Sequence, residues 1–114
     1  MRNEDPGIRA GAESIDIQEE GSHGALLLHG FGDTPQTLTR LAARLRSGGY
    51  GVYAPLLPGH GRTLASFRQS GADEWADAAK TAFMKMRPRH RTVSVVGLSM
   101  GGALAVALTA EVQD

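Results

Sequence analysis

The stretch Val93-Ser94-Val95-Val96-Gly97-Leu98-Ser99-Met100-Gly101-Gly102-Ala103 decides the fold class of this 114-residue chain. It begins with β-branched residues typical of a buried strand and leads into apolar residues at helical spacing. Between the two lies Gly97-x-Ser99-x-Gly101, which is typical of a very sharp strand-to-helix turn with a serine at its apex. Glycine at both flanking positions removes the collisions that side chains would cause in such a turn. The stretch therefore predicts an exposed Ser99 hydroxyl at the start of a helix, where developing negative charge is favoured.

Strands and helices alternate outward from this turn. Apolar runs predict strands at residues 14–18, 25–28, 50–54 and 92–96, and apolar residues at helical spacing predict helices at 35–47, from about 73 to 87, and after residue 102. Glycines and prolines make 55–62 a loop. This alternation predicts an α/β fold, a three-layer α/β/α arrangement around a mostly parallel sheet. We divide the chain into an irregular N-terminal segment, residues 1–13, and one folded segment, residues 14–114.

Composition excludes several classes of function. Twelve basic residues balance twelve acidic ones, so no overall field attracts nucleic acid. The basic run at residues 85–91 is interrupted by Pro88 and carries no aromatic residues for base stacking, so we interpret it as a solvated link between a helix and a strand. The absence of cysteine excludes disulfides and thiolate metal sites. No apolar run approaches the roughly 20 residues of a membrane span, and no secretory signal is visible, so we expect a cytoplasmic protein.

A second glycine-rich turn, His29-Gly30-Phe31-Gly32, follows the first buried strand. Acyl transfer at a serine passes through a tetrahedral oxyanion, which requires preorganised N–H donors. In strand-turn-helix sites of this kind, one donor is the amide after the serine and the other comes from the loop after an earlier strand. Met100 and Phe31 occupy these two positions. The turn lacks the glycine spacing of a nucleotide-binding loop, and no phosphate-binding P-loop motif occurs in the chain.

These segments together resemble the N-terminal half of an α/β-hydrolase, in particular the bacterial carboxylesterase and monoacylglycerol lipase branch. The resemblance covers residues 25–112. Its motifs are Leu28-His29-Gly30-Phe31-Gly32, Leu57-Pro58-Gly59-His60-Gly61, Glu74-Trp75 and Gly97-Leu98-Ser99-Met100-Gly101-Gly102. The resemblance implies a partial α/β-hydrolase fold that needs no metal or cofactor. It implies Ser99 as nucleophile in an elbow made by Gly97 and Gly101, the amides of Phe31 and Met100 as oxyanion hole, and His29 and Gly30 as a supporting loop.

The chain departs from this family in one respect. The family places its acidic residue and its histidine after the serine, but the 15 residues that follow Ser99 contain no histidine. We therefore expect the chain to be part of a longer hydrolase and to be inactive alone. Of its four histidines, His60 is the least implausible substitute base, and His29 is expected to be structural. His23 and His90 are expected in exposed turns, and Trp75 and Phe83 in the core.

The resulting hypothesis is a serine hydrolase that acts on small carboxylic esters, with an apolar acyl pocket lined by Phe31, Leu57 and Met100. Amide, peptide and thioester hydrolysis remain alternatives within the same family. A different class also remains open, namely a naturally short, non-catalytic chain that binds a ligand or a partner. A parallel sheet that stops after these strands leaves an apolar edge unpaired, so self-association through that edge is a further expectation.

Overall fold

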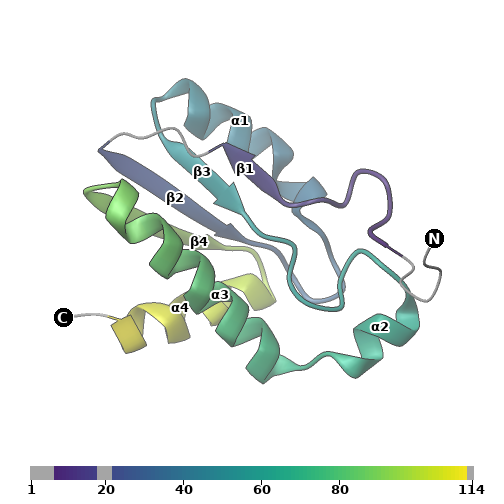
Figure 1. Cartoon of the computed structure of the whole chain (residues 1–114). Coiled ribbons are helices and arrows are strands. Elements are labelled where there is room, and N and C mark those ends of the chain that lie inside the picture. The colour runs from purple at the N-terminus through teal and green to yellow at the C-terminus, as the bar shows by residue number, and fades with distance from the viewer. Residues whose placement is uncertain (1–6, 18–21, 113–114) are drawn as a thin grey trace.

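A computed structural model describes residues 7–17 and 22–112 of the chain. Strands and helices alternate along it, with the carboxyl ends of the central strands directed toward one edge of the molecule (Figure 1). The elements in order are β1 (Ile15–Ile17), β2 (His23–Leu28), a 3-10 helix (Pro35–Leu38), α1 (Thr39–Ser47), β3 (Gly51–Ala54), α2 (Leu64–Gln69), α3 (Ala72–Met86), a second 3-10 helix (Arg87–Arg89), β4 (Thr92–Gly97) and α4 (Met100–Val112).

The four strands form one sheet in the order β1-β3-β2-β4. Strand β2 lies in the centre and runs parallel to both β3 and β4, whereas β1 runs antiparallel to β3 at the outer edge. The register pairs Leu28 with Gly97, so β2 and β4 end side by side. The prediction of a mostly parallel sheet is confirmed, and this pairing brings the loop after β2 next to the turn after β4.

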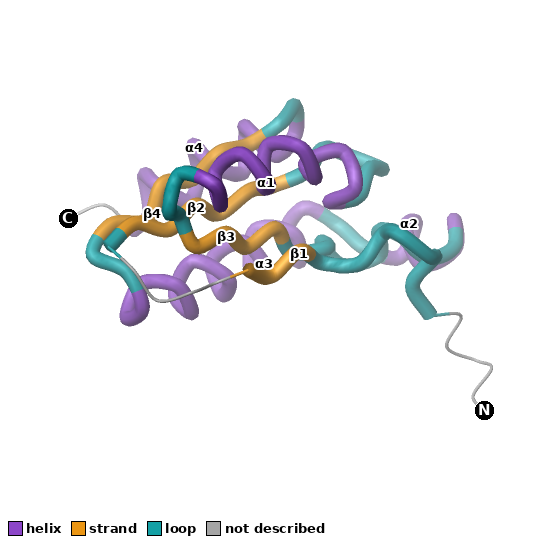
Figure 2. Tube along the Cα trace, turned by 90° about the horizontal axis from the view of Figure 1, so that it is seen from above, coloured by secondary structure: helices purple, strands orange, loops and turns teal. Residues whose placement is uncertain are grey.

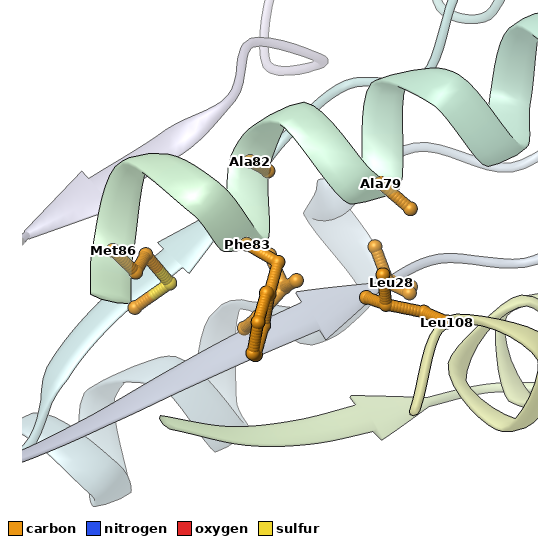
Figure 3. Close-up of a cluster of buried hydrophobic side chains, with 7 residues drawn as sticks. Leu28, Ala79, Ala82, Phe83, Met86 and Leu108 are labelled. Atoms are coloured by element: carbon orange, nitrogen blue, oxygen red, sulfur yellow. The ribbon is translucent and has the colours of Figure 1, made fainter. Parts of the chain in front are cut away.

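Side chains of β2 alternate between two hydrophobic cores, because successive residues of a strand point to opposite faces. Leu26 and Leu28 face α3 and α4, and Figure 3 shows Leu28 among the buried residues of that face. Ala25 and Leu27 face the other core, beneath α1. Figure 2 shows α1 and α3 on opposite sides of the strands, which is the predicted three-layer arrangement. The first core contains Leu26, Leu28, Ala79, Ala82, Phe83, Met86 and Leu108, and the second contains Ala25, Leu27, Leu38, Ala42, Val52 and Ala54.

Strand β2 begins at His23, two residues earlier than predicted, because His23 and Gly24 pair with the start of β4. Gly24 leaves room for the His90 ring, whose Cδ2 lies only 2.6 Å from where a Cβ on Gly24 would stand. His90 is therefore buried, with 5% of its surface exposed, and its prediction as an exposed turn residue is wrong. His23 is exposed as expected, and its Nδ1 lies 2.7 Å from the Thr92 hydroxyl.

The short helix α2 was not among the predicted elements. Thr63 caps it, since the Thr63 hydroxyl accepts a hydrogen bond from the Ser66 amide at 3.1 Å. The helix has no buried residue, so the apolar periodicity that identifies a helix in the sequence is missing here. It lies beyond the carboxyl ends of the strands (Figure 1), on the side of the molecule where the loops after β2 and β3 meet.

No helix among the described residues is long and apolar enough to cross a membrane. Residues 7–13, the described part of the segment predicted to be irregular, contain neither helix nor strand. Gln18, at the end of the first predicted strand, lies outside the described residues.

Candidate active site

Ser99 occupies the apex of the turn between β4 and α4. Its φ is 61°, the only positive value for a residue other than glycine among those described. Left-handed backbone costs a residue with a side chain about 1–2 kcal/mol, so the surrounding structure must hold it. Two backbone hydrogen bonds hold Ser99 in this conformation. The Ser99 carbonyl accepts from the Gly102 amide at 2.8 Å, and the Leu98 amide donates to the Leu28 carbonyl at 3.0 Å. The Ser99 side chain is exposed at the start of α4.

Two glycines make this turn sterically possible. A Cβ on Gly97 would stand 2.0 Å from the carbonyl oxygen of Gly101, and a Cβ on Gly101 would stand 2.0 Å from the carbonyl oxygen of Leu28. Both collisions involve backbone, which cannot move aside as a flexible side chain does. A Cβ on Gly102 would meet nothing nearer than 3.5 Å, so the close approach of helix and sheet occurs at Gly101.

The loop after β2 lies against Ser99. A Cβ on Gly30 would stand 3.4 Å from the Cβ of Ser99 and 3.9 Å from its Oγ, so Gly30 allows the backbone to approach the serine. Gly32 adopts a φ of 74°, which turns the loop sharply at this point. Among the hydrogen bonds of the described residues, none uses the N–H of Phe31 or of Met100. Both amides predicted as oxyanion donors are thus in segments that adjoin Ser99 and have no internal acceptor.

His29 is buried and links two loops. Its Nδ1 donates to the Gly30 carbonyl at 2.9 Å, and its Nε2 accepts from the Leu57 amide at 3.0 Å. These contacts fix the neutral tautomer with the proton on Nδ1. Burial lowers the pKa of His29 below its ordinary value of about 6.5, with a smaller lowering from nearby His60, while the Gly30 carbonyl and Asp33 act in the opposite direction.

His60 is buried in the same way. Its Nε2 accepts from the Gly32 amide at 3.0 Å, and its Nδ1 donates to the Pro58 carbonyl at 3.0 Å. Because backbone atoms occupy both ring nitrogens, His60 has no free lone pair to take a proton from Ser99. His29 is engaged in the same manner, so neither ring is placed to act as a general base.

Aromatic side chains surround His60 at this edge of the sheet. The Phe31 ring lies 4.9 Å from Phe67 and 5.7 Å from Trp75, measured between centroids. The His60 ring lies 5.0 Å from Phe67 and 5.3 Å from Trp75. Sequence reasoning missed Phe67, because it belongs to α2, and it assigned Trp75 only to the core. Trp75 is buried as predicted, yet its indole N–H also donates to the Pro58 carbonyl at 3.0 Å.

The predicted acyl pocket is not formed as expected. Leu57 is buried, with 1% of its surface exposed, and Phe31, Leu57 and Met100 do not line the pocket described next. A pocket of about 300 Å³ lies instead beside the loop after β3 and the start of α2. Its lining comprises Arg9, Gly32, Gly59, His60, Gly61, Arg62, Thr63, Leu64 and Phe67.

The acidic side chains nearest to this machinery in sequence have other partners. Asp33 accepts a hydrogen bond from the Thr37 hydroxyl at 3.0 Å. Glu111, on the outgoing helix, forms a 2.6 Å ion pair with Lys80 of α3. Neither carboxylate is bonded to a histidine ring among the described residues, so neither forms an acid–histidine pair here.

The fold and the turn at Ser99 define an α/β-hydrolase. Residues 25–113 match the model of the alpha/beta hydrolase family, and the chain belongs to that family. A thermostable monoacylglycerol lipase from Bacillus sp. strain H-257 is 35% identical over 101 residues, which are 89% of this chain and 40% of that enzyme. Lipase 3 from Moraxella sp. strain TA144 is 38% identical over 89 residues, 75% of this chain and 27% of that protein.

A solved structure from work on LipS and LipT, two metagenome-derived lipolytic enzymes, has the same arrangement of elements. It superposes with a TM-score of 0.88 and 34% sequence identity. The match covers 92% of this chain and 42% of the other. The chain thus spans less than half the length of the relatives it matches.

Proposed function

We propose that this chain carries the nucleophile and the oxyanion donors of a serine hydrolase that cleaves carboxylic esters. The observation that supports the proposal is the strained backbone of Ser99 beside Gly30, in a turn whose neighbouring Phe31 and Met100 N–H groups have no acceptor among the described residues. The lipases and lipolytic enzymes among its relatives support an ester as the substrate.

The reaction follows from these positions. The Ser99 Oγ attacks the ester carbonyl carbon while its proton passes to a general base, and the carbonyl oxygen becomes an oxyanion. The Phe31 and Met100 amides donate hydrogen bonds to that oxyanion, and α4 contributes the positive end of its dipole. The alcohol leaves with the proton, and water then cleaves the acyl-serine to release the acid. Removing one such donor in a comparable site costs about 10²–10³-fold in kcat.

The general base comes from outside these 114 residues. Both candidate rings near Ser99, His29 and His60, are engaged through both nitrogens by backbone groups. We therefore propose that the chain acts as part of a longer hydrolase and does not turn over esters alone. Without a base and its acidic partner, the loss is on the order of 10⁴–10⁶-fold.

The decisive experiment restores the proposed missing groups. Residues 1–114 are fused to the part of the Bacillus monoacylglycerol lipase that follows the matched segment, and hydrolysis of a monoacylglycerol and of a p-nitrophenyl ester is measured. We expect the fusion to hydrolyse both esters, and Ser99→Ala to reduce kcat by about 10³-fold or more. Ser47→Ala, the same change at an exposed position of α1, is the matched control and should leave kcat unchanged.

Other outcomes separate the alternatives. A fusion that folds but cleaves amides or thioesters in preference to esters moves the assignment to another reaction of the same family. A folded fusion with no hydrolytic activity, or one that Ser99→Ala leaves fully active, contradicts the proposal and favours a non-catalytic binding role.

A further inference from the structure

The loops after β2 and β3 are joined by two histidines, each of which accepts a backbone N–H from the other loop. His29, in the first loop, accepts the amide of Leu57 from the second. His60, in the second loop, accepts the amide of Gly32 from the first. The two rings lie 4.9 Å apart between centroids in an edge-to-face arrangement. Each loop is therefore held by a ring from the other.

These bonds fix both peptide groups on either side of Phe31. The Gly30 carbonyl, which shares a peptide plane with the Phe31 N–H, accepts from the His29 ring at 2.9 Å and from the Asp33 amide at 3.1 Å. In a trans peptide the N–H points opposite to the C=O, so these two donors direct the Phe31 N–H away from them. On the other side, the Gly32 N–H is held by His60 at 3.0 Å.

His60 is itself rigidly placed. Its side chain is only 2% exposed, and its Nδ1 donates to the Pro58 carbonyl. The same carbonyl accepts the indole N–H of Trp75, which ties it to α3. With the proton on Nδ1, the Nε2 lone pair accepts the Gly32 amide. Phe67 and Trp75 pack against the His60 ring, with centroid distances of 5.0 Å and 5.3 Å.

We propose that His60 is a positioning residue for the oxyanion hole: by accepting the Gly32 N–H as an Nδ1–H tautomer, it fixes the backbone of Phe31 so that the Phe31 amide faces the oxyanion at Ser99. This inference rests on the proposed hydrolase function for its catalytic consequence. The link from His60 to Gly32 is tested independently of that function.

The link is tested by nitrogen NMR on the ¹⁵N-labelled 114-residue chain. We expect a coupling across the hydrogen bond between the Gly32 amide nitrogen and the His60 Nε2, together with the chemical shifts of an Nδ1–H tautomer at neutral pH. His60→Phe keeps a ring but removes the acceptor, and we expect amide hydrogen exchange at Gly32 to accelerate by about tenfold. His60→Gln restores an acceptor near the Nε2 position and should recover most of the protection.

Three results of this measurement would overturn the link: an Nε2–H tautomer, the absence of the coupling, or unchanged exchange at Gly32 in His60→Phe. If His60→Phe does not fold, the coupling and the tautomer in the unmodified chain still decide the question. His23→Phe is the matched control, because His23 is an exposed histidine at the opposite end of β2, and it should leave exchange at Gly32 unchanged.

The catalytic consequence is measured in the active fusion described above. We expect His60→Phe to lower kcat by at least about tenfold, approaching the 10²–10³-fold cost of removing an oxyanion donor, with KM changed less than about threefold. His60→Gln should recover most of kcat, and His23→Phe should leave it unchanged. Equal kcat in folded His60→Phe and the parent fusion contradicts the positioning role. A fusion without activity contradicts the proposed function instead, while the NMR result stands by itself.

Discussion

The Leu28 carbonyl oxygen and the α-carbon of Gly101 are so close that no side chain fits between them. A Cβ on Gly101 would lie 2.0 Å from this oxygen, whereas the Cβ of a Gly102→Ala variant would meet only ordinary contacts at 3.5 Å and beyond. We therefore expect Gly101→Ala to destabilise the chain by about 3 kcal/mol, because strand or helix backbone must shift. Gly102→Ala should instead stabilise it by about 0.5–1 kcal/mol, because alanine favours a helix.

Urea unfolding of the two alanine variants, followed by circular dichroism, measures this difference directly. The two positions are neighbours in one helix and the two changes are chemically identical, so each variant controls for the other. Equal stabilities for Gly101→Ala and Gly102→Ala would contradict the close approach of α4 to β2.

Residue types and spacing were sufficient to predict the turn at Ser99 but not the partners of the histidines. A serine between two glycines has few alternatives when a strand precedes it and a helix follows. By contrast, the ring of His60 bonds to an amide 28 residues earlier in the chain. Whether a histidine serves as a base or is held by backbone depends on that distant partner. The residues around His60 in the sequence do not identify this partner.

At the scale of elements, His29 couples the loop after β2 to the loop after β3, and its lowered pKa makes that coupling sensitive to pH. The folded state takes up a proton on His29 at lower pH than the unfolded chain, whose histidine titrates near 6.5. Stability from this group is therefore complete above about pH 6.5 and decreases as the pH falls below it, by at most about 1.4 kcal/mol per pH unit.

Thermal or urea unfolding between pH 7.5 and pH 5 tests this expectation, with all pH values chosen to bracket the ordinary histidine value of about 6.5. His29→Gln keeps an acceptor for the Leu57 amide but cannot titrate. We expect it to be less stable than the parent at neutral pH and to approach the parent as the pH falls. His23→Gln, at an exposed position, should run parallel to the parent. A stability difference between His29→Gln and the parent that stays constant over this range would contradict the assignment.

Elements with a buried apolar face could be predicted from the sequence, and those without one could not. The helices α1 and α3 and the strands β2, β3 and β4 all contribute to the two cores, and each was expected close to its observed bounds. The helix α2 buries no side chain, so its sequence has no apolar residues at helical spacing from which to predict it. His90 is polar and follows a run of arginines, but the missing side chain of Gly24 gives its ring a buried place. That pairing of distant residues is invisible in a single sequence.

On the scale of the whole molecule, one face remains apolar. Strand β4 is at the edge of the sheet, and residues 92–110, from the start of β4 through most of α4, include no charged side chain. Val96 and Leu98 are exposed, and Val106 of α4 is 70% exposed. Edge strands normally avoid pairing with other chains through charges, prolines or covering elements. Among the described residues, none of these protects β4.

We therefore propose that the 114-residue chain associates with copies of itself through the face formed by β4 and α4. Sedimentation velocity at micromolar to millimolar concentrations, where exposed strand edges associate, should show dimers or larger species that increase with concentration. Val106→Lys places a charge on this face without disfavouring the helix and should shift the distribution toward monomer. Met84→Lys makes the same change at a 54% exposed position of α3 and should have no such effect. A parent chain that stays monomeric throughout, or equal effects of the two lysines, would mean that this face is not the one that associates.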